Sequence, residues 1–114
     1  MSFWKYRPGA QESKSLDAAT TGAGKAISYA NYEKVQYLIQ GNGAVGAGAV
    51  QIETAHDPTF SGTWSPVGTP VTVVANAEVG ATVDAPPGGF VRARVTTTVT
   101  GGTVTVYLNA IQGE

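Results

Sequence analysis

The chain contains no cysteine, few charged residues and no long apolar run. Without cysteine it has neither a disulfide framework nor a Cys-ligated zinc site. Charged residues make up 13% of the 114 positions, against about 25% in an average protein. The net charge is −1 and the basic residues are scattered, which argues against nucleic-acid binding. No apolar segment approaches the roughly 18 residues of a membrane-spanning helix, and no signal-peptide core is expected at the N-terminus.

What the sequence has instead is an alternation of apolar and polar residues with a period of two. In "YEKVQYLIQ", Val35, Tyr37 and Ile39 share one face, and only Leu38 breaks the pattern. Such alternation is typical of half-buried strands, and helix signals are almost absent. Further strands are expected at residues 49–55, 70–77, 78–85, 90–99 and 103–111. The sequence predicts an all-β, antiparallel β-sandwich or small barrel of six to eight strands.

Two glycine-rich turns, "GNGAVGAG" and "TGG", separate strands of matching pattern. They predict two hairpins, one over residues 32–55 and one over 90–111. The inward face of the second hairpin is expected to carry Val91, Ala93, Val95 and Val99, followed by Val104, Val106, Leu108 and Ala110. The larger core residues are expected to be Tyr37, Leu38, Ile39, Ile52, Trp64 and Leu108.

Residues 1–24 show no sustained period and predict an extended N-terminal arm, which precedes a sandwich domain at 25–114. Its first part, "SFWKYRPG" (residues 2–9, here called the aromatic leader), carries Phe3, Trp4, Tyr6 and Arg7. Exposed aromatic side chains are avoided by soluble monomers and favoured at interfaces. The leader either packs back on its own sandwich or binds another chain, and these four residues are the candidates for partner binding.

The segment "HDPTFSGTW" holds the only histidine, His56, beside Asp57. One histidine without cysteine is a poor metal site, and no nucleophile motif surrounds the nearby serines. We therefore expect no catalytic residues, metal or cofactor. Asp-Pro instead favours a turn in which Asp57 bonds the backbone and Gly62 takes a positive φ. Phe60 and Trp64 then form a lid over the end of the sandwich or, with Tyr32, a sugar-stacking platform.

Arg92 and Arg94 lie on the outward face of their strand. One interpretation is a solvated sheet face. The other is a subunit contact, in which the two guanidinium groups pair with carboxylates of a neighbouring subunit.

The run "YLIQGNG…VQIETAHDPTFSGTWSPVG…FVRARVTTTVTGGTVTVYLNA" resembles small β-sandwich structural proteins of tailed bacteriophages, over roughly residues 35–111. The resemblance implies a non-enzymatic virion protein, assembled in the host cytoplasm and foremost a capsid decoration (cement) protein. It also implies a homo-oligomer, with a trimer favoured, bound to the major capsid protein or another virion protein, and no nucleic acid or membrane. A tail or neck component and a carbohydrate-binding host-recognition module remain the alternatives.

Overall fold

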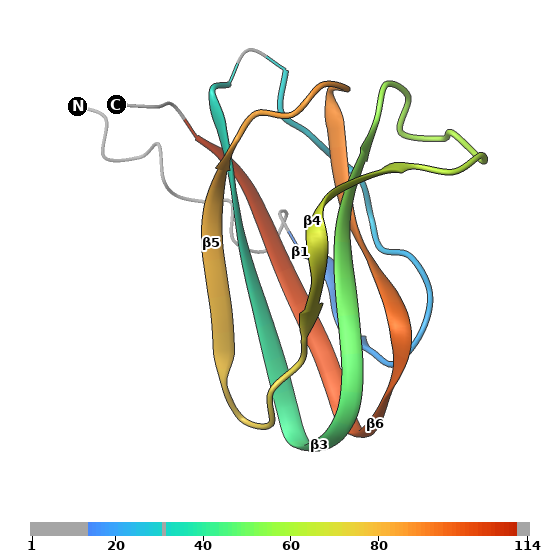
Figure 1. Cartoon of the computed structure of the whole chain (residues 1–114), viewed down its shortest axis with the longest axis vertical. Helices are drawn as coiled ribbons and strands as arrows, with labels where there is room; N and C mark the ends of the chain where they lie inside the picture. Colours follow the sequence, from blue (N-terminus) through green and yellow to red (C-terminus); the bar gives the residue numbers. More distant parts are fainter. Residues whose placement is uncertain (1–13, 31, 112–114) are drawn as a thin grey trace.

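The computed structural model describes residues 14–30 and 32–111, and these residues form an antiparallel all-β fold (Figure 1). Two strands are long and four are short. The strands are β1 (Lys14–Ala19), β2 (Ile27–Ser28), β3 (Lys34–Ala55), β4 (Ser65–Thr72), β5 (Glu78–Asp84) and β6 (Phe90–Ile111). The predicted all-β class is therefore confirmed.

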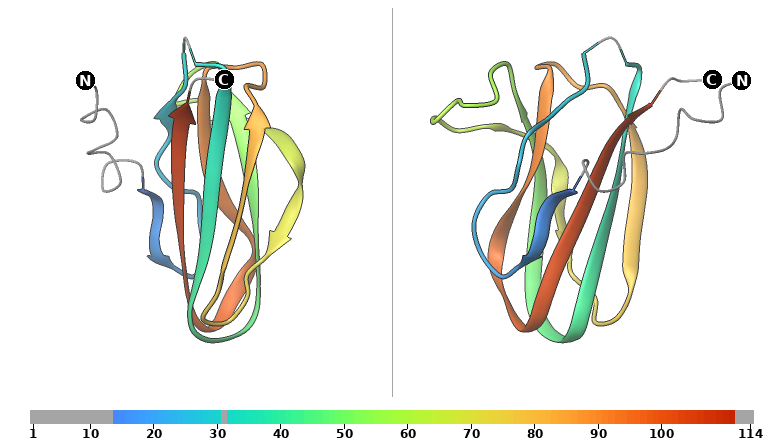
Figure 2. Two further views of the ribbon diagram at one scale, coloured as in Figure 1. Left: turned by 90° about the vertical axis from the view of Figure 1, so that its left-hand side faces the viewer. Right: turned by 180° about the vertical axis from the view of Figure 1, so that it is seen from behind.

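All six strands belong to one hydrogen-bonded sheet, which folds over on itself to make the two layers of a sandwich. In layer A the order is β1, the second half of β6, the first half of β3, and β5. In layer B it is β2, the first half of β6, the second half of β3, and β4. The long strands β3 and β6 thus run through both layers, and they turn together at one end of the molecule (Figures 1 and 2).

The two predicted hairpins are wrong, although their strands are present. The halves of β3 pair with β6, from Lys34 opposite Ile111 to Ala55 opposite Phe90, and not with each other. Each glycine-rich turn therefore carries its strand from one layer to the other, and the two turns lie side by side. Alternation and turn residues are the same for both arrangements, so the sequence pattern does not distinguish them.

Glycines allow the two turns to lie so close together. Gly43 and Gly101 adopt φ values of 87° and 81°, in the left-handed region that other residues rarely adopt. A Cβ atom on Gly101 would press against the carbonyl oxygen of Ala44 in the neighbouring turn. The register of β3 against β6 also shifts between Gly43 and Val50, as expected where a strand bends sharply.

The core lies between the two layers and consists mainly of valine, with a few larger side chains. The predicted inward residues Val91, Ala93, Val99, Val104, Val106 and Leu108 are buried, as are Ile39 and Ile52. The prediction that Leu38 lies in the core is wrong, because this side chain is half-buried on the outer face of layer A. Leu16 and Tyr29 were not expected in the core but are each 4% exposed. The Tyr29 hydroxyl donates to the carbonyl oxygen of Pro86 at 2.7 Å.

The predicted extended arm at residues 1–24 is wrong for its second half, residues 14–24, which belongs to the folded domain. Lys14–Ala19 forms β1, an edge strand of layer A, and its Leu16 reaches the core. Ser15 bridges the two layers, since its hydroxyl donates to the carbonyl of Lys25 and accepts from the N–H of Ala93. The aromatic leader lies outside the described residues. The folded domain therefore begins at or before Lys14 rather than near residue 25.

Candidate functional site

The outer face of layer B carries a buried carboxylate held by two arginines. Glu53 is 2% exposed and lies directly opposite Arg92 in the pairing of β3 with β6. Arg92 Nε donates to Glu53 Oε1 at 2.8 Å, and Arg94 Nε donates to Oε2 at 3.0 Å. Charge-assisted bonds of this kind offset the cost of burying a carboxylate. The arginines predicted as a possible subunit contact thus have their carboxylate partner within the chain.

Trp64 covers this ion cluster. Its ring stacks on the Arg92 guanidinium, 4.0 Å from the ring centroid, and its Nε1 donates to the carbonyl oxygen of Phe60 at 2.8 Å. The Trp64 side chain is 3% exposed, whereas Phe60 is 46% exposed. The two aromatics therefore form neither a joint lid nor a sugar-stacking platform. Trp64 instead shields an ion cluster on the outer face, outside the main core.

The turn at residues 57–60 forms as its sequence predicts, and the N–H of Phe60 donates to the carbonyl oxygen of Asp57 at 3.1 Å. Asp57 Oδ1 accepts hydrogen bonds from the backbone N–H and the hydroxyl of Thr59, at 2.9 and 2.8 Å. These bonds lower the pKa of the Asp57 carboxyl. His56 is exposed, and its Nδ1 lies 3.3 Å from the carbonyl oxygen of Gly88. Among residues 14–30 and 32–111, no group of three His, Cys, Asp or Glu side chains is placed to hold a metal ion.

The prediction that Gly62 takes a positive φ is wrong, although the loop does require a glycine at this position. Its φ is not positive; instead, a Cβ atom there would lie 2.5 Å from Cζ of the Phe60 ring. The glycine is therefore required for close packing of the ring over the backbone rather than for a left-handed turn.

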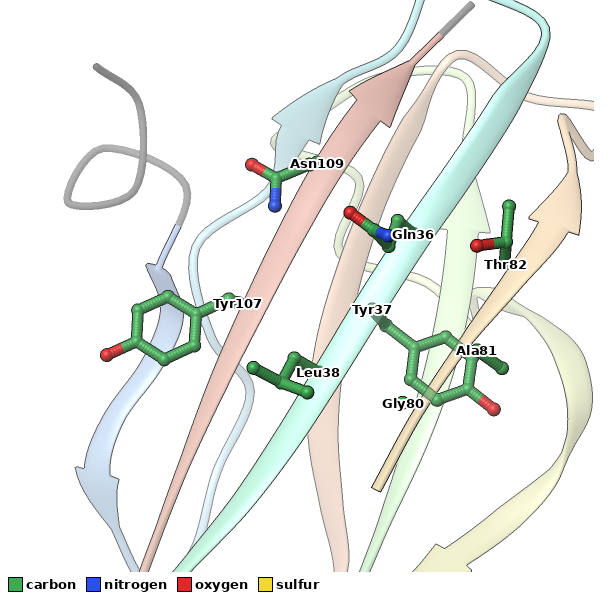
Figure 3. A pocket seen from close by; sticks show the side chains of 8 residues that line it. All are labelled: Gln36, Tyr37, Leu38, Gly80, Ala81, Thr82, Tyr107 and Asn109. Atoms are coloured by element: carbon green, nitrogen blue, oxygen red, sulfur yellow. The ribbon is translucent and has the colours of Figure 1, made fainter. Parts of the chain in front are cut away.

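A second surface lies on the outer face of layer A, where a shallow groove of about 610 Å³ crosses three strands (Figure 3). Its lining includes Gln36, Leu38, Gly80, Thr82, Tyr107 and Asn109. Leu38 pairs with Tyr107 on one side and with Gly80 on the other, so these three form one row across the sheet. Leu38 and Tyr107 make the floor partly apolar, while amide and hydroxyl groups lie in the next row.

Charged and amide side chains mark the two ends of the β5 strand beside this groove. Lys34 Nζ donates to Asp84 Oδ1 at 2.7 Å, and Gln40 Nε2 donates to Glu78 Oε2 at 2.9 Å. The hydrogen bond between the two side chains raises the pKa of Lys34 and lowers the pKa of Asp84. The Asp84 side chain is nevertheless 89% exposed, so most of its surface is open to a further partner.

Sequence reasoning missed Glu53, the residue that organises the outer face of layer B. The reason is that the hairpin assignment placed Glu53 in a different unit from Arg92 and Arg94. A pairing of the two long β segments with each other would have put Glu53 opposite Arg92. The signal was the presence of a carboxylate and two arginines on outward positions of neighbouring strands.

Comparisons with protein-family models, with curated proteins and with solved structures find no match. The part of the chain that the structure describes contains no helix that is long and apolar enough to cross a membrane.

Proposed function

We propose that this chain is a non-enzymatic structural protein of a bacteriophage virion, acting as a capsid decoration protein on the outer surface of the head. The observation that carries the proposal is a compact sandwich whose buried polar side chains bond to its own groups. Glu53 is held by two arginines, and Gln51 donates to carbonyl oxygens of residues 52, 67 and 68. A rigid block of this kind suits a protein whose outer surfaces bind neighbouring subunits.

The sequence resemblance to small phage β-sandwich proteins supports the same proposal, because it covers both long strands and the loop before β4. A decoration protein gains affinity by repeating a modest contact around the symmetric head, which is multivalent binding. A tail or neck component would use the same sandwich, and only its position in the particle separates the two roles. The buried Trp64 disfavours the sugar-binding alternative, which needed Trp64 and Phe60 exposed together.

The test is to locate the chain in purified particles by mass spectrometry and cryo-electron microscopy. We expect copies on the outer head surface that follow the symmetry of the capsid. Heads that lack the chain should lose their genome at lower temperature than heads to which it has been added back. Copies confined to the neck or tail would contradict the decoration role, and absence from particles would overturn the virion assignment altogether.

A further inference from the structure

The groove on the outer face of layer A opens toward the free edge of β5. Gly80, which lies beside Leu38 on the outer face, carries no side chain, so the wall between the groove and the edge is low at this position. Leu38 and Tyr107 provide an apolar floor beside it (Figure 3). A groove of this size and lining fits one or two aromatic side chains that approach from the β5 side.

The hydrogen-bond pattern shows which backbone groups face that edge. Gly41 N–H donates to the Ala77 carbonyl and Ala85 N–H to the Glu33 carbonyl. Bonded and outward-facing residues alternate along an antiparallel strand. Odd-numbered residues of β5 therefore bond to β3. The backbone N–H and C=O groups that point toward the open edge are those of Glu78, Gly80, Thr82 and Asp84.

The other described edges of the sandwich are poorly suited to pairing with a further strand. β4 carries Pro66 and Pro70, β1 has two register shifts, and β2 contains two residues. Prolines, bulges and short length are the usual protections of edge strands. β5 has none of them: it pairs with β3 in unbroken register over seven residues and contains no proline.

We propose that the β5 edge and its groove bind the aromatic leader of a second copy of this chain, as an added strand. Main-chain bonds to the edge would supply affinity, and the groove would accept the aromatic side chains. The leader holds Phe3, Trp4 and Tyr6 within four consecutive residues, together with Lys5. The inference goes beyond the proposed function, because it concerns self-association, which occurs in solution without a particle.

Charge complementarity favours the leader over the β5 edge of a second copy. The leader has two positive side chains, Lys5 and Arg7, and no negative one, whereas β5 has Glu78 and Asp84 and no positive one. Two β5 edges paired about Ala81 would place Glu78 of each copy opposite Asp84 of the other. Like charges directly opposite one another destabilise a strand pair.

Geometry favours a leader from a second copy over the chain's own leader. Residues 1–13 precede β1, which lies at the opposite side of layer A from β5. Crossing the layer to a new position beyond β5 takes four strand spacings, about 19 Å, or roughly six extended residues. The chain's own leader would have to run across the outer face of layer A, over the groove itself, before it could pair with the β5 edge. A leader from a second copy approaches the edge from outside.

The proposal is tested by sedimentation equilibrium of the full chain and three sets of variants. Thr82→Pro removes one outward N–H from the edge while leaving the bonds to β3, and Thr82→Ala is its matched control. Leu38→Lys places a charge in the groove. The triple variant Phe3→Ala/Trp4→Ala/Tyr6→Ala alters the leader alone. Thermal unfolding monitors whether each variant still folds.

We expect the full chain and Thr82→Ala to form a dimer or a closed ring. Oligomers of three variants should be weaker, with a dissociation constant at least tenfold higher than that of the full chain. These are the leader variant, Leu38→Lys and Thr82→Pro. Mixing the leader variant with Leu38→Lys should restore a complex, because one chain keeps an intact groove and the other an intact leader. A full chain that stays monomeric, an oligomer indifferent to the leader and groove variants, or a mixture that restores nothing would overturn the proposal. A monomer that still binds heads would leave the proposed function standing.

Discussion

Glu53 is the residue on which the outer face of layer B depends. Replacing it with glutamine keeps the shape but removes the negative charge that faces two guanidinium groups. Breaking a buried ion pair costs about 3–5 kcal/mol, and the half-exposed Arg94 regains part of this from water. We therefore expect Glu53→Gln to lower the free energy of unfolding by about 2–4 kcal/mol, measured by urea denaturation.

The matched control is Glu78→Gln on β5. Glu78 is exposed, and its hydrogen-bond donor is the neutral amide of Gln40. Exposed substitutions of this kind usually change stability by less than about 0.5 kcal/mol. Equal effects of the two substitutions would show that the arginine pair does not depend on the buried carboxylate.

At the scale of elements, the paired turns of β3 and β6 place the strongest demand on particular residues. Gly101→Ala forces a left-handed φ on a residue with a Cβ and presses that atom against the Ala44 carbonyl. Strain and displaced backbone together should cost about 2–4 kcal/mol.

Gly46→Ala in the adjacent turn is the control, because its φ is not positive and its new Cβ would meet only Thr100 Oγ1, at 3.6 Å. Its effect should lie within about 1 kcal/mol of zero. Thermal or urea unfolding of both variants measures the difference, and a Gly46→Ala variant as unstable as Gly101→Ala would contradict this account of the turns.

The elements also show how far the sequence alone could lead. Alternation identified the strands around Val35 and Val91 and their inward faces, because side-chain direction follows from the period of a strand. It did not identify their partners, since pairing depends on contacts between distant segments. The list of core residues was wrong at Leu38, which it included for its size although the alternation puts it on the outer face. It also lacked Leu16, because the short strand β1 shows no sustained period. The Asp57 turn was predicted because its hydrogen bonds are local.

The same distinction between single strands and strand combinations applies to the candidate surfaces. Arg92 and Arg94 were placed on an outward face from one strand alone, and the structure has them there. Their partner Glu53 and their cover Trp64 come from other strands and loops, so neither association was visible in the sequence. The groove beside Gly80 is likewise a product of three strands brought together. Properties of single strands were predictable here, and properties of strand combinations were not.

At the scale of the whole molecule, one sheet folded over on itself explains both the thin valine core and the two outer faces. Each long strand contributes to both layers, so a residue near its start and one near its end lie in different layers. This arrangement makes the contacts long-range: Lys34 pairs with Ile111, and Ala55 with Phe90. Folding therefore requires closure of large loops before β3 and β6 pair.

Engineered disulfides distinguish this arrangement from two hairpins, and the absence of native cysteine leaves no background. Gln36 and Asn109 are paired across β3 and β6, so Gln36→Cys/Asn109→Cys should oxidise to an intramolecular disulfide. Closing a loop of this length should stabilise the fold by up to about 4 kcal/mol. The bond is detected by mass spectrometry of peptides digested without reduction.

Thr98→Cys/Thr103→Cys is the contrasting pair. These positions flank the turn at Gly101 and would be neighbours in a hairpin, but here one belongs to layer B and the other to layer A. Thr98 directly precedes the inward Val99, and Thr103 directly precedes the inward Val104. Because neighbouring side chains alternate across a strand, the two threonines lie on opposite outer faces, too far apart for a disulfide. We expect this pair to remain reduced under conditions that oxidise the first. The reverse result would show that β6 folds back on itself, and the two-layer arrangement would then be wrong.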